Sequence, residues 1–103
     1  MARGVLQQSA HMSRDVVRRR LIVSGHVQGV FFRASVKEKA DNEGVAGWSA
    51  NRDDGSVEVV LEGPPEAVES VAGYCRTGPV NARVDSVESR DEDPEGLTGF
   101  TAR

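Results

Sequence analysis

The sequence predicts one α+β domain whose strands and helices follow in the order β-α-β-β-α-β, with a short fifth strand at the end. Three observations predict it. Short apolar segments are bounded by glycine, two further segments repeat apolar residues at helical spacing, and an Asp-Gly turn joins the second and third strands. This order is that of the ferredoxin-like βαββαβ sandwich, an antiparallel sheet of four to five strands with two helices on one face.

Length and composition fit a single soluble domain. The chain has 103 residues, of which 28% are charged and 38% hydrophobic, and no apolar run is long enough to span a membrane. Residues 1–17 follow no period, so we expect a disordered tail there, either native or left by a cloning junction before Met12, and a folded domain over 18–103. A single cysteine, Cys75, excludes an internal disulfide and indicates a reducing cytoplasm.

The charges are spread unevenly along the chain. Residues 1–20 carry five arginines against one aspartate, whereas residues 21–103 carry eight basic residues against fifteen acidic ones. An acidic body argues against nucleic acid as a partner, because a phosphate backbone requires a basic surface. His11 and His26 are the only histidines and lie far apart, so we expect no metal site and no cofactor.

The first strand and the first helix flank a glycine-bounded loop. An apolar run at residues 21–23 predicts a strand over 18–24. Apolar residues at the spacing i, i+4, i+8 predict a helix over 33–43 that ends at Gly44. The buried face of this helix is expected to hold Phe32, Val36 and Ala40.

The rest of the chain predicts a hairpin, a second helix and further strands. The turn at residues 51–55 ends in Asp-Gly and favours a hairpin. Two prolines open the second helix and a Gly-Pro pair closes it, while Val84 and Val87 break strict alternation and indicate a bulge in the last long strand. The expected ranges are strands over 45–51, 56–62 and 82–90, a helix from 64 to 77 with Val68, Val71, Ala72 and Cys75 on its apolar face, a polar loop over 91–99 and a short strand over 100–103.

The loop between the first strand and the first helix can hold an anion. Gly25 and Gly29 allow positive φ angles and a close approach of a ligand to the main chain. Unpaired N–H groups of the loop and of the helix N-terminus converge there, and the helix dipole favours a negative charge. Arg33 adds a planar fork of donors that matches two phosphate oxygens. The loop has neither a Walker ending nor a G-x-G-x-x-G pattern, so by itself it fits a plain strand–helix connection equally well.

The end of the second strand supplies another polar group. In the expected topology the first and second strands run parallel with the third between them, so Arg33 and Asn51 lie at one edge of the sheet, about 10 Å apart at the backbone. A carboxamide has one acceptor and two donors and can hold a water molecule in line with a bound phosphate. A carboxylate there would repel the anion. The pair therefore suits attack of water on phosphorus.

These residues resemble the two signatures of the acylphosphatase family. The whole stretch 25–33, Gly-His-Val-Gln-Gly-Val-Phe-Phe-Arg, matches the first signature. Residues 47–51 match the second in outline, and the resemblance covers about residues 18–103. The second signature continues with Gly55, Val57 and Gly63 at the expected spacing.

Two positions beside Asn51 depart from the family pattern. Ser49 stands where a small apolar residue is usual, and Ala50 where a longer, often basic residue is common. We therefore expect a difference in strand pairing or local charge at this point. Neither departure removes a catalytic group.

The resemblance implies hydrolysis of the carboxyl–phosphate anhydride of small acyl phosphates to carboxylate and inorganic phosphate. It implies a monomeric enzyme without metal, in which Arg33 and the loop amides bind the phosphoryl group and Asn51 orients the attacking water. The substrate's own phosphate oxygen takes the proton, and because the leaving group is good, positioning and charge stabilisation suffice. The loop residues implied are His26, Val27, Gln28, Gly29, Val30, Phe31 and Phe32.

Two other functions fit parts of the pattern. The same fold hosts RNA-binding domains, so the alternative is a non-catalytic module that binds phosphate or nucleic acid. Such domains stack bases on aromatic residues of the sheet, and the expected strand over 56–62 contains none. A third interpretation assigns the phosphate cradle to a phosphate-sensing or carbamoyl-phosphate-handling domain, as in larger proteins that carry acylphosphatase-like modules.

Several single residues have plain structural interpretations. We expect Trp48 and Cys75 in the core, and His26 in the loop without a role as a base. The aromatic pair at 31–32 either belongs to the core or lines the mouth where an acyl group sits. The arginines at 18–20 are expected to keep a strand edge soluble.

Overall fold

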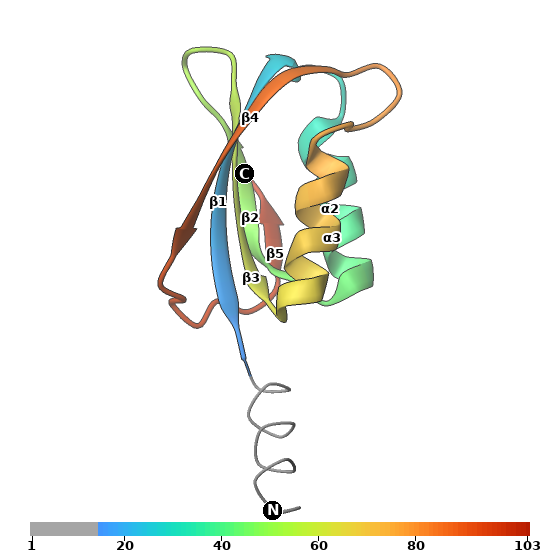
Figure 1. The fold of residues 1–103 in the computed structure, drawn as a ribbon. Coiled ribbons are helices and arrows are strands. Elements are labelled where there is room, and N and C mark those ends of the chain that lie inside the picture. The colour runs from blue at the N-terminus through green and yellow to red at the C-terminus, as the bar shows by residue number, and fades with distance from the viewer. Residues whose placement is uncertain (1–14) are drawn as a thin grey trace, which may run out of the picture.

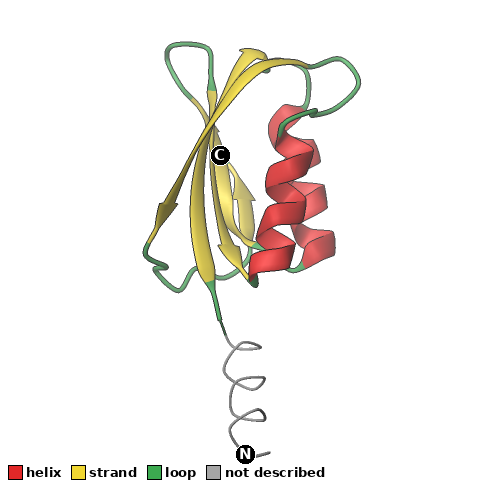
Figure 2. Ribbon diagram, in the orientation of Figure 1, coloured by secondary structure: helices red, strands yellow, loops and turns green. Residues whose placement is uncertain are grey.

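A computed structural model describes residues 15–103; most of the expected tail, residues 1–14, lies outside the described residues. Two helices cover one face of a five-stranded sheet, and the other face of the sheet is open (Figures 1 and 2). The expected ferredoxin-like α+β arrangement is therefore confirmed. The elements are β1 (Val17–His26), α2 (Phe32–Glu43), β2 (Ala46–Asn51), β3 (Val57–Gly63), α3 (Pro65–Cys75), β4 (Arg83–Glu92) and β5 (Phe100–Ala102).

The strands lie side by side in the order β4-β1-β3-β2-β5. β1 pairs antiparallel with β3 and β4, and β2 pairs antiparallel with β3. β5 confirms the expected fifth strand but runs parallel to β2, so the sheet is mixed rather than wholly antiparallel. The reason is the long connection after β4, which carries the chain to the opposite edge of the sheet, where the last residues run in the same direction as β2 (Figure 1).

Two strand boundaries extend beyond the expected ranges. β1 begins at Val17, which pairs with Gly63, so the folded part starts before the boundary predicted at residue 18. β4 continues to Glu92 because that residue lies opposite Arg18 of β1. The bulge expected in β4 is present, since the register between β1 and β4 shifts after Ser24.

Both helices present the expected apolar faces to the sheet. Gly44 ends α2 in the left-handed conformation, with φ 72°, and its N–H donates to the last turn. α3 begins after Pro64 and carries Glu66 in its first turn, where an acid is favourable, but it ends at Cys75, before the expected Gly-Pro stop. The buried helix residues are Phe32, Val36 and Ala40 in α2 and Val68, Val71, Ala72 and Cys75 in α3.

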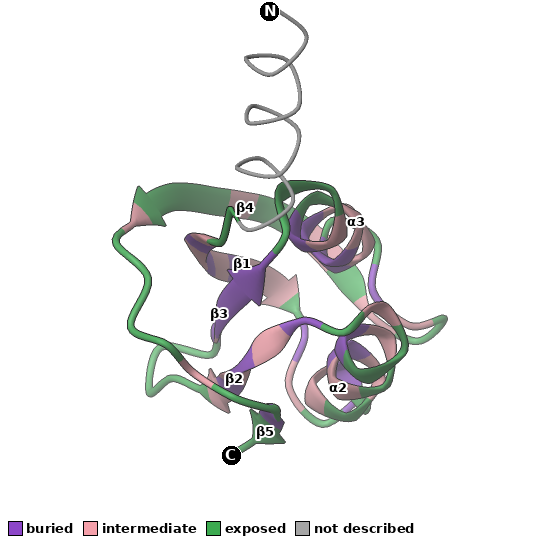
Figure 3. Cartoon of the chain, turned by 90° about the horizontal axis from the view of Figure 1, so that it is seen from below, coloured by how far each residue is buried: buried purple, intermediate pink, exposed green. Residues whose placement is uncertain are grey.

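The core lies between the helices and the inner face of the sheet, where buried residues of both layers meet (Figure 3). Cys75 belongs to it, as expected, and burial raises the pKa of its thiol to about 12, so the group stays protonated. The strands contribute Leu21, Val23, Val57, Val59, Leu61 and Phe100.

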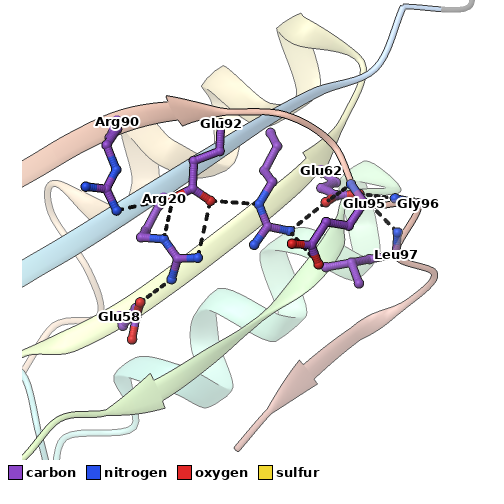
Figure 4. A network of polar contacts seen from close by, with 9 residues as sticks. Arg20, Glu58, Glu62, Arg90, Glu92, Glu95, Gly96 and Leu97 are labelled. Carbon is purple, nitrogen blue, oxygen red and sulfur yellow. Dashed lines mark hydrogen bonds and ion pairs between the residues drawn. The ribbon is translucent and has the colours of Figure 1, made fainter.

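The arginines at 18–20 do not protect a strand edge, because β1 lies inside the sheet between β3 and β4. On the open face, Arg18 donates to Glu62 at 2.7 Å and to Glu92 at 2.8 Å. Arg20 donates to Glu92 at 2.8 Å and to Glu58, so the acids of β3 and β4 meet the arginines of the strand between them (Figure 4). These hydrogen bonds, first from Arg20 and then from Arg18, lower the pKa of Glu92 to about 2.

Glu62 links this network to the connection between β4 and β5. Besides Arg18, its buried carboxylate accepts N–H groups from Glu95, Gly96 and Leu97 at 2.9–3.1 Å (Figure 4). Burial alone would raise the pKa of the Glu62 carboxyl, but the N–H donors and the guanidinium of Arg18 hold it below its usual range. One side chain thus fixes the segment that leads into β5.

Candidate active site

The sheet register brings the ends of β1 and β2 together. Val57 of β3 lies opposite Val23 of β1 on one side and opposite Asn51 of β2 on the other. Asn51 is therefore two strand spacings, about 10 Å, from Val23, which lies three residues before the end of β1 at His26. This is the shared edge that the topology predicts.

The loop between β1 and α2 leaves backbone N–H groups available. Gly25 and Gly29 have positive φ angles of 133° and 77°, and Phe31 precedes α2 in the left-handed conformation. No side chain caps the helix, and the Ser35 N–H donates a hydrogen bond to the Phe31 oxygen at its start. The preceding N–H groups at the start of α2 thus have no partner within the helix and can meet an anion.

Arg33 lies in the first turn of α2, where its guanidinium reaches the other end of the described chain. Its Nη1 donates a hydrogen bond to the main-chain oxygen of Arg103, just after β5. The Arg103 N–H in turn donates to the Ser49 oxygen of β2 at 2.7 Å. β5 and β2 thus orient the guanidinium, and phosphate oxygens would compete with the main-chain oxygen for the same donor.

A cavity of ≈ 430 Å³ lies beside Arg33. Asn51 is not part of its wall; it is exposed at the end of β2, and within residues 15–103 its side chain has no hydrogen-bond partner. The carboxamide of Asn51 is therefore free to hydrogen-bond a water molecule. The wall is formed by Val27, Gly29, Phe31, Phe32, Arg33, Ala34 and Ala102.

Three residues of the expected loop do not line this cavity. His26 is exposed as the last residue of β1, and Val30 is buried. Gln28 donates from Nε2 to the Arg52 oxygen at 2.8 Å and to the Ser56 oxygen at 3.0 Å. This amide joins the loop to the turn that follows Asn51, a role that only the folded arrangement reveals, since the partners are main-chain atoms more than twenty residues away.

Trp48 is not a core residue, contrary to expectation. It lies half-buried on the open face of β2, with the guanidinium carbon of Arg103 4.2 Å and that of Arg20 5.7 Å from its ring centroid. Ser49 takes the inward position instead, fully buried with an unpartnered hydroxyl. The alternation in β2 could have indicated this, because Ser49 and Asn51 share a face that Trp48 does not.

The described part of the chain has neither a metal-binding cluster nor a membrane-spanning helix. Within residues 15–103 no three side chains of His, Cys, Asp or Glu lie where they could hold a metal ion together. In the same range no helix has the length and apolar character needed to cross a membrane.

Known proteins resemble this chain in sequence and in fold. The family model described as Acylphosphatase matches residues 19–102. The chain belongs to the acylphosphatase family. An acylphosphatase from Natronomonas pharaonis is 51% identical over 89 residues, which cover 86% of this chain and 97% of that protein.

Solved structures agree with the family assignment. The crystal structure of acylphosphatase from Bacillus subtilis has a TM-score of 0.82 at 38% identity, covering 84% of this chain and 98% of that one. A HypF structure from T. kodakarensis has a TM-score of 0.73 at 29% identity, covering 84% of this chain but only 12% of that one. The acylphosphatase arrangement thus occurs in short chains and within a much longer one.

Proposed function

We propose that the chain hydrolyses small acyl phosphates to carboxylate and inorganic phosphate without a metal. The observation that carries the proposal is that Arg33 and the uncapped start of α2 border one cavity, and that Arg103 links Arg33 to Ser49 of β2, the strand that ends at the exposed Asn51. The membership of the acylphosphatase family supports the same reaction. The cavity wall has a single charged side chain, Arg33, which suits an anionic phosphoryl group.

The residues act on the phosphoryl group by position and charge. Arg33 and the free N–H groups at the start of α2 hold the non-bridging oxygens, which pulls electron density from phosphorus. Asn51 holds a water molecule for attack on phosphorus. A new bond forms between the water oxygen and phosphorus while the bridging bond breaks, and the carboxylate leaves with the electron pair. The water proton passes to a phosphate oxygen, so no side-chain base is required.

The test measures phosphate release from acetyl phosphate in the presence of EDTA. Wild type is expected to turn over, and Asn51→Ala is expected to lose about 10²-fold or more in kcat. Asn42→Ala, on the exposed surface of α2, is the matched control and should keep wild-type turnover. No turnover by a folded wild type would reject the function, and turnover only with added metal would reject metal independence.

A second variant tests the guanidinium. Arg33→Lys keeps the charge but loses the planar fork, so kcat/KM is expected to fall about 10²–10³-fold. Arg90→Lys on β4, an exposed arginine outside the cavity, is the control. Near-wild-type turnover of Arg33→Lys would reject two-point binding of the phosphoryl group.

The non-catalytic alternative predicts ligand binding without turnover. An RNA-binding surface is not favoured, because the open face carries paired arginines and acids and β3 has no aromatic residue. Salt-dependent RNA binding by the full chain would revive it. The cytoplasmic location and the monomeric state remain predictions from the sequence.

A further inference from the structure

Phe31 has a backbone conformation that bulky side chains rarely adopt. With φ 64° and ψ 24°, it is the only non-glycine residue at positive φ among residues 15–103. Glycine or asparagine would take this conformation more readily. The residue is 80% exposed, so core packing does not explain a phenyl group here. A strained, exposed aromatic residue beside a cavity points to a role in ligand binding.

The neighbouring Phe32 has the opposite surroundings. Phe32 is 1% exposed and belongs to the core. A Cβ atom added to Gly78 would approach the Phe32 ring to 2.6 Å, so this ring is enclosed by the connection after α3. Of the two adjacent rings, only that of Phe31 is free to meet a ligand.

The cavity has one charged wall residue and an otherwise apolar lining. Arg33 is the charged residue, and Phe31 lines the same cavity. A larger cavity of ≈ 650 Å³ on the open face of the sheet differs in character, since most of its wall is charged. The cavity beside α2 therefore matches a ligand with one anionic end and an apolar body, whereas the open-face cavity does not. The charged residues of the open-face cavity are Arg20, Arg52, Asp54, Glu58, Glu88 and Arg90.

We propose that Phe31 selects substrates by their acyl group and favours aromatic or bulky apolar acyl phosphates over acetyl phosphate. The proposal rests on the acyl phosphate hydrolysis proposed above. With the phosphoryl group held by Arg33 and the start of α2, the acyl group lies against the apolar wall, and the Phe31 ring is the exposed apolar surface available to cover it. The two residues line one cavity, in which Arg33 binds the anionic phosphoryl group and Phe31 contacts the acyl group.

The experiment compares benzoyl phosphate with acetyl phosphate in wild type, Phe31→Asn and Phe31→Tyr. Asparagine accepts the left-handed conformation, so Phe31→Asn removes the ring without adding backbone strain, and Phe31→Tyr keeps the ring. We expect the ratio of kcat/KM for benzoyl over acetyl phosphate to fall about five- to tenfold in Phe31→Asn and to stay near the wild-type ratio in Phe31→Tyr.

A binding measurement separates this proposal from the hydrolysis itself. Calorimetry with benzylphosphonate and methylphosphonate compares an aromatic with a small ligand that carry the same anionic head and undergo no hydrolysis. Phe31→Asn should weaken the binding of benzylphosphonate about five- to tenfold more than the binding of methylphosphonate. An unchanged preference, or an equal loss for both ligands, would overturn the role of Phe31. Selective loss in a chain that hydrolyses neither acyl phosphate would support the role of Phe31 and reject the proposed reaction.

Discussion

Glu62→Gln tests how much the buried ion pair contributes to stability. The Glu62 and Arg18 side chains are 2% and 4% exposed, and their charged atoms lie 2.7 Å apart. The glutamine keeps the shape of the side chain but removes the charge. Its NH2 group also places a donor where the carboxylate now accepts from Arg18 and from three main-chain N–H groups.

The expected loss is about 3 kcal/mol of unfolding free energy. Removing one partner of a buried pair costs about 3–5 kcal/mol, and the lower end applies because Arg18 keeps Glu92 at 2.8 Å. With a urea m-value of about 1–3 kcal/mol/M, the unfolding midpoint should fall by about 1–3 M. Trp48 is the only tryptophan and lies on the same face of the sheet, so its fluorescence reports the transition.

Glu69→Gln is the matched control. Glu69 pairs with Arg19 at 2.6 Å, but its side chain is 59% exposed, so solvent screens the pair and the midpoint should move much less. Equal shifts for Glu62→Gln and Glu69→Gln would refute the reasoning, because burial would then have no influence on the pair.

Three further substitutions follow from the sheet. Glu92 has a pKa of about 2 against its usual value of 4.5; its stabilising contribution is complete above pH 4.5 and is lost as the pH falls toward 2. In Glu92→Gln the urea midpoint should therefore depend less on pH in that window than in wild type. An unchanged slope of midpoint against pH would contradict this. Ser49→Ala removes a buried hydroxyl without a partner and should raise the unfolding free energy by about 1 kcal/mol, seen as a higher Tm; a lower Tm would show that the hydroxyl is satisfied. Gly47→Ala places a Cβ 1.8 Å from a main-chain oxygen of β3 and should prevent soluble expression, so normal stability would contradict the close packing of β2 on β3.

Periodicity and glycine positions predicted most of the fold. The helical spacing of Phe32, Val36 and Ala40 and the stop at Gly44 are local signals, and the structure confirms both. The direction of β5 was not predictable in the same way, because three residues of strand carry no signal for which edge they join. The direction of β5 depends on the strand with which it pairs, and no pattern within the segment indicates that partner.

The misplaced residues depend on the order of the strands. Arg18 and Arg20 were expected at an edge, but β4 returns beside β1 and encloses them. Trp48 was expected in the core, yet Ser49 takes the inward position on β2. The period-two alternation of the strand was the better guide to this placement.

The residues proposed for the candidate site come from the sequence, whereas their contacts could not be predicted from it. The glycine-bounded loop with Arg33 indicated an anion site. The parallel direction of β1 and β2 predicted that Asn51 lies at the same end of the sheet. The bond from Arg33 to the Arg103 oxygen and the bridge from Gln28 to the following turn join segments far apart in the chain. Both end on main-chain oxygens, which every residue has, so no sequence pattern marks them.

The central claim is that water attacks the phosphorus of an acyl phosphate bound at Arg33 and the start of α2. The most direct test is turnover of benzoyl phosphate in water enriched in ¹⁸O, with EDTA present and with mass spectrometry of both products. Attack on phosphorus predicts that the label enters inorganic phosphate and that the released benzoate stays unlabelled. Label in the benzoate would mean attack on the carbonyl carbon, and would contradict the roles proposed for Arg33 and Asn51.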